Sequence, residues 1–293
     1  MHTFDRAKVI VVRGVRSLAF WLVLGAVVGV LFIVGAAGRP AVGLIKIPVA
    51  ISSIEQTQDI VRMMKYSRDS RDIRAVVLQI DSPGGSAVLL EEIYLALTDL
   101  RRVKPVVTTV DTMALSGGYL IGVAADSIYV KPTSMIGNIG VWMSLQEQDE
   151  LTDDVLPTGP YKLSGLALRD AAKMLEMVKE GFVGEVMKER GDRLKMTKED
   201  VSQGKIYLGL EGVKLGLADK IGSTDDAIAG AAKLARVANY SVVDVAEKLD
   251  ISLSLPFFFF KGDAPPVEDR GAPARDPAPR FYYLYPDSRE ALR

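Results

Sequence analysis

The chain has 293 residues, of which 48% are hydrophobic and 25% charged, and its formal net charge of −1 gives no indication of nucleic-acid binding. It contains no cysteine, which excludes a thiol nucleophile, a disulfide framework and a thiolate metal site. The single histidine is His2, so neither a Ser–His–Asp triad nor a histidine-rich zinc site is expected in the folded part, and a hydrolase would need another base.

The first feature along the chain is an uncharged apolar segment at residues 17–37. A helix of this length spans the roughly 30 Å hydrocarbon core of a bilayer. Basic residues are more frequent before the segment than after it: Lys8, Arg13 and Arg16 precede it, and Arg39 follows. This asymmetry predicts that residues 1–16 are cytoplasmic and that the rest of the chain lies outside. A cleaved signal peptide is the alternative, with GAAGRP as its cleavage region, but the apolar run is long for one, so we favour a retained anchor.

Residues 38–255 alternate between short apolar runs and amphipathic helical patterns, which predicts an α/β domain built on a parallel sheet with right-handed crossover helices. Strands are expected near residues 42–51, 73–81 and 104–111, with helices at 54–68 and 87–102 between them. Residues 168–200 look wholly helical. A turn and a closing helix are expected within 216–236, with Asp225 and Asp226 in the first turn of that helix.

The final segment, residues 256–293, has a different composition. It begins with PFFFF, which we expect to contact a neighbouring subunit rather than the membrane interface. A charged, proline-rich stretch follows, and we expect it to be disordered. The aromatic sequence FYYLY then begins at residue 281. This segment could occupy a peptide groove of its own assembly, bind a partner, or be a frayed end without a role.

Two glycine-rich turns follow predicted strands. The sequence DSPGG at residues 81–85 is, taken alone, most simply a turn, but bare glycine backbone there could also provide an N–H group to an oxyanion. Ser116 stands in ALSGGY after the next strand, where a serine is usually a helix N-cap but could be a nucleophile on a sharp strand-to-helix turn. Both turns are expected at the carboxyl ends of successive parallel strands, where open α/β sheets bind ligands.

Lys162, in TGPYKLSG, is the candidate base. Most lysines are solvated surface groups, and taken alone Lys162 would be read in the same way. A lysine can nevertheless replace histidine as a general base when burial lowers its pKa towards neutrality, as in serine–lysine hydrolases. With no usable histidine in the chain, a Ser116–Lys162 pair is the leading candidate for catalysis.

With these two turns and the Ser116–Lys162 pair, the sequence resembles the signal peptide peptidase A family of membrane serine peptidases, whose domain belongs to the ClpP/crotonase superfamily. The similarity extends from about residue 42 to about residue 236 and is carried by five segments in the same order. These are DSPGG at 81, ALSGGYLIGVAAD at 114, MIGNIGV at 135, GPYKLSG at 159 and GKIYLGLEGVKLGLADKIG at 204.

The resemblance implies that Ser116 is the nucleophile, that Lys162 is the general base, and that Gly84 or Gly85, together with Gly117, donates to the oxyanion. It also implies a ClpP/crotonase-like fold, no metal or organic cofactor, and homo-oligomers on the membrane that face away from the cytoplasm. The implied substrates are remnant signal peptides. A single copy of the domain in the chain favours homo-oligomerisation, because several chains would then form the active-site bowl.

One position departs from the family pattern. The family often has a lysine-orienting serine in the segment that matches MIGNIGV, where this chain has Asn138. The amide oxygen of Asn138 can accept a hydrogen bond from a lysine, so Asn138 is the candidate for orienting Lys162. Four apolar residues nearby are either lining of the substrate groove or plain core: Leu115, Ile139, Val141 and Trp142.

Three alternatives to this function remain open. An acyl-CoA hydratase relative would use similar backbone donors, but has no need of SGG and a distant lysine. A membrane protease of the stomatin-partner type would share the serine–lysine pair. A catalytically inactive peptide-binding scaffold would keep the fold without the chemistry. Intact Ser116 and Lys162 argue against the last alternative.

Overall fold

A computed structural model of the chain describes residues 20–29, 39–143, 158, 167–253 and 281–284. The chain divides into two compact units, residues 1–40 and 41–293. In the first unit, residues 20–29 form a helix with exposed apolar side chains. Among the described residues, none of the helices has both the length and the apolar character needed to cross a membrane. The predicted anchor at 17–37 extends beyond residues 20–29 on both sides, so it stays a prediction.

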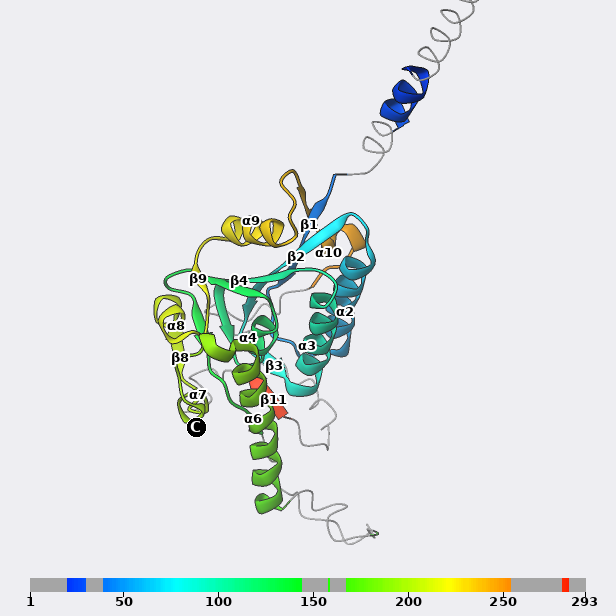
Figure 1. The fold of residues 1–293 in the computed structure, drawn as a ribbon. Helices are drawn as coiled ribbons and strands as arrows, with labels where there is room; N and C mark the ends of the chain where they lie inside the picture. The colour runs from blue at the N-terminus through cyan, green and yellow to red at the C-terminus, as the bar shows by residue number, and fades with distance from the viewer. Residues whose placement is uncertain (1–19, 30–38, 144–157, 159–166, 254–280, 285–293) are drawn as a thin grey trace, which may run out of the picture. The chain divides into compact units, whose positions relative to one another are not determined.

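The second unit is built on a mainly parallel sheet (Figure 1). Its strands run in the order β10-β1-β2-β4-β5-β9, and every neighbouring pair in this path is parallel. The bounds are β1 Ala41–Ile47, β2 Ile73–Ser82, β4 Val106–Leu115, β5 Ser127–Val130, β9 Lys220–Ile221 and β10 Ser241–Asp244. Two shorter strands extend the sheet beside β4: β6 Met135–Gly137 and β8 Ile206–Leu208. The predicted α/β class with a parallel sheet is therefore confirmed.

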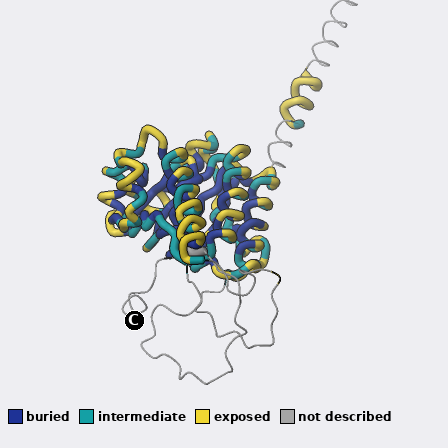
Figure 2. Tube along the Cα trace, turned by 90° about the horizontal axis from the view of Figure 1, so that it is seen from below, coloured by how far each residue is buried: buried dark blue, intermediate teal, exposed yellow. Residues whose placement is uncertain are grey.

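Side chains on both faces of the sheet are buried, which explains the near-continuous apolar strands. Along β2, Val76, Leu78 and Ile80 belong to the larger core, while Ala75 and Val77 belong to a second core. This alternation follows the two-residue period of a strand. Figure 2 shows the buried segments in the interior of the unit with exposed turns around them.

Helices cover both faces. The larger core packs against α2, α3, α4 and α6, and the second core packs against α9 (Figure 1). The bounds are α2 Ile54–Asp69, α3 Ala87–Arg101, α4 Gly117–Val123, α6 Leu168–Arg190, α7 Lys198–Val201, α8 Gly209–Leu215, α9 Thr224–Leu234 and α10 Val245–Leu249. Capping boxes start three of these helices, at Ser53 for α2, at Thr197 for α7 and at Ser223 for α9. Asp225 and Asp226 lie in the first turn of α9, as predicted.

One prediction about the helices is wrong. Residues 168–200 are not wholly helical, because α6 ends at Arg190 and a 3-10 turn, η1 Gly191–Arg193, follows before α7 begins at Lys198. Gly191 ends the helix with a φ of +49°, a conformation that glycine adopts with little strain. The charged residues around Gly191 continue the helical pattern of the sequence, so the pattern alone does not indicate that α6 ends there.

A separate three-stranded sheet lies beside the large one, in the order β3-β11-β7. Its strands are β3 Gly84–Ser86, β7 Trp142–Met143 and β11 Phe281–Leu284. The predicted tail, residues 256–293, lies outside the described residues except for β11. The predicted boundaries of the tail and of the domain at 38–255 therefore stay predictions.

Candidate active site

Ser116 lies between the end of β4 at Leu115 and the start of α4 at Gly117. Its φ of +51° and ψ of −120° are unusual for a residue with a side chain, and such conformations cluster at functional sites. Its hydroxyl makes no capping bond to α4, so the N-cap alternative does not explain this serine. The Oγ instead lies 3.4 Å from the carbonyl oxygen of Gly140, and the backbone N–H donates to Gly137 O at 2.8 Å. Ser116 thus sits on a sharp strand-to-helix turn.

The first glycine turn follows β2 and leads into β3. The N–H of Gly84 donates to Ser82 Oγ at 3.2 Å. On one edge of β3, Ile51 N donates to Gly84 O at 2.9 Å and Ser86 N donates to Ile51 O at 2.8 Å. Because alternate residues of a strand direct their backbone groups to opposite edges, the N–H and C=O of Gly85 face away from Ile51. A Cβ at Gly85 would lie 2.0 Å from Ile51 O, so only glycine allows this approach.

The two glycine turns lie side by side. Ser82 at the end of β2 is in register with Ala114 near the end of β4. A Cβ on Gly118 would lie 2.6 Å from the carbonyl oxygen of Ser82, so bare backbone in α4 lets that helix pack directly on the first turn. The predicted meeting of the turns at the carboxyl ends of neighbouring parallel strands is therefore confirmed.

Asn138 lies directly after β6, which pairs with the end of β4. It has a φ of +52°, its backbone N–H donates to Lys205 O at 2.7 Å, and its side-chain Nδ2 donates to Gly204 O at 2.8 Å. These bonds fix the plane of the amide and direct its nitrogen at Gly204, which leaves the amide oxygen as the atom that would accept from a lysine. The role of Asn138 stays a prediction, because Lys162 lies outside the described residues.

The structure therefore brings together Ser116, Gly117, the two glycines of β3 and the strand that leads to Asn138, while 159–166, with Lys162, are not described. α6 begins at Leu168, six residues after Lys162. Of the four apolar groove candidates, Leu115 and Ile139 are buried in the domain, Val141 packs against the larger core, and Trp142 lies in β7.

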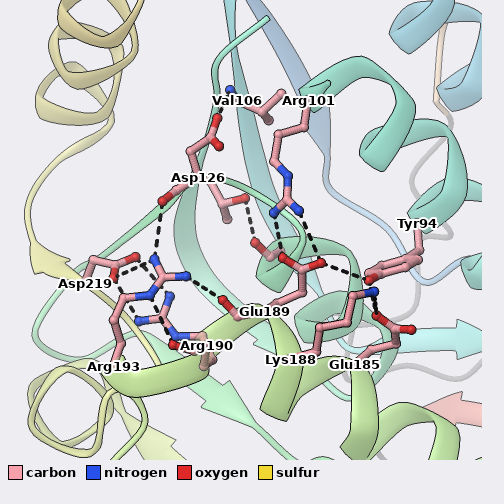
Figure 3. Close-up of polar contacts among 12 residues, drawn as sticks. Tyr94, Arg101, Val106, Asp126, Glu185, Lys188, Glu189, Arg190, Arg193 and Asp219 are labelled. Atoms are coloured by element: carbon pink, nitrogen blue, oxygen red, sulfur yellow. Dashed lines mark hydrogen bonds and ion pairs between the residues drawn. The ribbon is translucent and has the colours of Figure 1, made fainter. Parts of the chain in front are cut away.

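A polar network joins the end of α6 to its neighbours (Figure 3). Arg190 is only 1% exposed and binds Asp219 with two hydrogen bonds, Nη1 to Oδ2 at 3.0 Å and Nη2 to Oδ1 at 2.9 Å. Its Nε donates to Gly216 O at 2.6 Å. Asp219 also accepts from Ile128 N at 2.7 Å. The segment 216–219 is thus held between α6 and β5.

The same segment supports α4. Tyr119, three residues after Ser116, donates its hydroxyl to Leu217 O at 2.8 Å. Burial raises the pKa of Tyr119 above the ordinary range of a phenol, so the hydroxyl stays a donor. Burial is the largest single influence on Asp219 and opposes its ionisation. The hydrogen bonds and charge of Arg190, the Ile128 N–H and the charge of Arg193 together outweigh burial, so the pKa of Asp219 lies below its ordinary value.

One residue before Arg190 on α6, Glu189 contributes a second part of the network. It accepts two hydrogen bonds from Arg101 of α3, one of 2.7 Å from Nη1 and one of 3.2 Å from Nη2. Tyr94, also on α3, donates to Glu185 and Glu189, as Figure 3 shows. These contacts tie α6 to α3. These contacts could not be predicted from the helical pattern, because charged residues on an amphipathic helix normally form its solvated face.

Comparison with known proteins relates the chain to peptidases. The family described as Peptidase family S49 matches residues 98–238. A predicted protease of Methanocaldococcus jannaschii is 31% identical over 186 residues, which cover 59% of this chain and 60% of that protein. A predicted signal peptide peptidase SppA of Enterococcus faecium is 26% identical over 202 residues, covering 64% of this chain and 58% of that protein.

The chain thus spans less than two thirds of the length of either relative. Among solved structures, a mutant of a membrane-bound stomatin-specific protease superposes with a TM-score of 0.44 and 14% sequence identity, over 64% of this chain and 83% of that chain.

Proposed function

Because this chain belongs to the signal peptide peptidase A family, within peptidase family S49, we propose that it is a membrane-anchored serine endopeptidase. Its substrates would be remnant signal peptides or other short apolar peptides. The observation that carries the proposal is Ser116, whose hydroxyl caps no helix and whose backbone is strained at the junction of β4 and α4. Such a turn presents a nucleophile above the carboxyl edge of a parallel sheet.

The proposed mechanism uses Ser116 and Lys162 as a pair. A neutral Lys162 amine takes the hydroxyl proton of Ser116 as Oγ attacks the substrate carbonyl carbon, and it later gives that proton to the leaving amine. Water then hydrolyses the acyl-enzyme and restores the Ser116 hydroxyl. The free lysine must be uncharged, so we expect kcat/KM to rise with pH through the pKa of Lys162.

Backbone N–H groups would stabilise the oxyanion. The predicted donors are Gly117 and one glycine of the first turn. The N–H of Gly84 already donates to Ser82 Oγ, whereas that of Gly85 faces away from Ile51, which favours Gly85 as the second donor. Asn138, with its amide nitrogen directed at Gly204, would accept a hydrogen bond from Lys162 through its oxygen.

We also propose a single-pass protein of the cell membrane, with a cytoplasmic N-terminus and an extracytoplasmic peptidase domain of the ClpP/crotonase type. The charge asymmetry around residues 17–37 supports this topology. Homo-oligomerisation is part of the proposal. It is supported by large apolar side chains that stand exposed on α6, where Leu168 is 73% exposed and Met177 is 74% exposed.

The experiment is mass spectrometry of the products formed from a panel of signal peptides by the full chain in detergent. Wild type should cleave within the apolar region, and Ser116→Ala should yield no product. Ser52→Ala is the matched control, because Ser52 is exposed and belongs to neither β4 nor α4. Cleavage that survives in Ser116→Ala would refute Ser116 as the nucleophile. No cleavage of any peptide by wild type would refute the peptidase activity and favour the inactive scaffold.

A further inference from the structure

Tyr119 joins the proposed nucleophile to a distant part of the chain, and the proposed function gives it no role. The residue is only 1% exposed and belongs to the larger core. Its backbone N–H donates to Ser116 O at 3.0 Å, and its hydroxyl donates to Leu217 O at 2.8 Å. One residue therefore binds Ser116 through its backbone and, through its side chain, a residue 98 positions further along the chain.

The carbonyl group that accepts from Tyr119 belongs to a firmly held segment. Leu217 is fully buried, and its N–H donates to Gly212 O at 2.8 Å, as does the N–H of Ala218 at 3.2 Å. Asp219, two residues after Leu217, accepts two hydrogen bonds from the buried guanidinium of Arg190 (Figure 3). Leu217 O is thus a fixed point in the domain, and the Tyr119 hydroxyl ties α4 to it.

Ser116 needs such a fixed point because its backbone conformation, with a φ of +51°, is strained. A strained residue keeps its conformation only where the surrounding structure over-determines it. On the strand side, Ser116 N donates to Gly137 O, and on the helix side Ser116 O accepts from Tyr119 N. α4 has only seven residues, Gly117–Val123, and so short a helix does not hold itself by its own hydrogen bonds. The position of its first turn therefore depends on side-chain contacts.

We propose that Tyr119 is a positioning residue for the reaction: its hydroxyl holds the first turn of α4 where Ser116 Oγ and Gly117 N–H are aligned on the substrate carbonyl. This inference rests on the proposed function, since it adds a residue to the same site. A misplacement of about 1 Å can cost about 100-fold in rate, and we expect about tenfold for loss of one hydroxyl that leaves the ring in place. The loss should fall on kcat rather than KM, because the alignment matters in the transition state.

Steady-state kinetics of the full chain in detergent on a fluorogenic apolar peptide test the inference. Tyr119→Phe should lower kcat about tenfold and change KM less than about twofold. Tyr129→Phe is the matched control, because Tyr129 is 7% exposed, belongs to the second core and loses only a hydroxyl that accepts from Lys220 Nζ at 3.2 Å. The control should leave kcat and KM unchanged. Equal kcat values for the two variants would overturn the inference.

A double variant separates positioning from a general loss of stability. Asp219→Asn should also lower kcat, because it loosens the segment that contains Leu217. In Tyr119→Phe/Asp219→Asn the two losses should not multiply, since both act through the same hydrogen bond from Tyr119 to Leu217 O. Losses that multiply, or losses of activity that only follow the folded fraction measured by circular dichroism, would contradict the proposed role of Tyr119.

Hydrogen exchange provides a readout that needs no turnover. Backbone amides at the start of α4 should exchange faster in Tyr119→Phe than in wild type or Tyr129→Phe, because the turn opens more often once its tie to Leu217 O is lost. Unchanged exchange in residues 116–123 would overturn the inference. If exchange differs as expected but wild type hydrolyses no peptide, the proposed function fails, while the role of Tyr119 in holding α4 stands.

Discussion

Removing one partner of the Arg190–Asp219 pair should destabilise the domain strongly. In Arg190→Met, Asp219 keeps its hydrogen bond from Ile128 and its ion pair with Arg193 at 3.3 Å, but loses both bonds to Arg190. Leaving one member of a buried pair uncompensated costs about 3–5 kcal/mol of unfolding free energy. For a domain of this size, that corresponds to a fall in Tm of about 10 °C.

The assay is thermal and urea unfolding of the protein in detergent, followed by circular dichroism. Arg102→Met is the matched control, because Arg102 pairs with Asp99 on the surface, where their side chains are 78% and 53% exposed. That loss should cost less than about 1 kcal/mol. The double variant Arg190→Met/Asp219→Leu should be more stable than Arg190→Met alone, because no unpaired charge remains. A single variant within about 0.5 kcal/mol of wild type would refute the role given to this pair.

Three other predictions follow from the same structure. Gly118→Ala should lower kcat/KM about 100-fold, because the Cβ of the new alanine would lie 2.6 Å from Ser82 O and push α4 away. The control Gly184→Ala, at an exposed position of α6 where a Cβ meets no neighbouring atom, should instead add about 0.5–1 kcal/mol to the free energy of unfolding. Ser116→Gly should be more stable than Ser116→Ala by about 1–3 kcal/mol in urea unfolding, since glycine relieves the strain at φ +51°, and equal stabilities would contradict that strain. Because the folded-state pKa of Asp219 is lowered, its ionised form should stabilise the domain above pH about 4, and this contribution should disappear as the pH falls through that pKa. In Asp219→Asn, the free energy of unfolding should therefore depend less steeply on pH in the acid range.

Much of the fold follows from local pattern. The strands at 73–82 and 106–115 were predictable because residues on both of their faces are buried, which leaves an apolar run bounded by glycine-rich turns. The meeting of the two turns followed from parallel topology, and Ser82 and Gly118 confirm it. These features depend on neighbours in sequence or on one general rule of sheet geometry.

Other features depend on tertiary contacts that no local pattern encodes. Burial of Arg190 requires a carboxylate that lies 29 residues further along the chain and the carbonyl oxygen of Gly216. The end of α6 at Arg190 was predictable in part, since Gly191 stands there in the sequence, but the surrounding charges favoured a continuing helix. The pairing of β11 with β3 joins residues nearly 200 positions apart, so only the hypothesis of a groove-binding tail anticipated it.

The central claim is that Ser116 is a nucleophile that Lys162 activates. Its most direct test is labelling of the full chain in detergent with a serine-directed phosphonate, followed by peptide mapping and comparison of wild type with Lys162→Met across a range of pH. We expect one adduct, on Ser116, whose rate of formation rises with pH in wild type and is nearly abolished in Lys162→Met. An adduct on another residue, or equal labelling of Ser116 with and without the lysine, would contradict it.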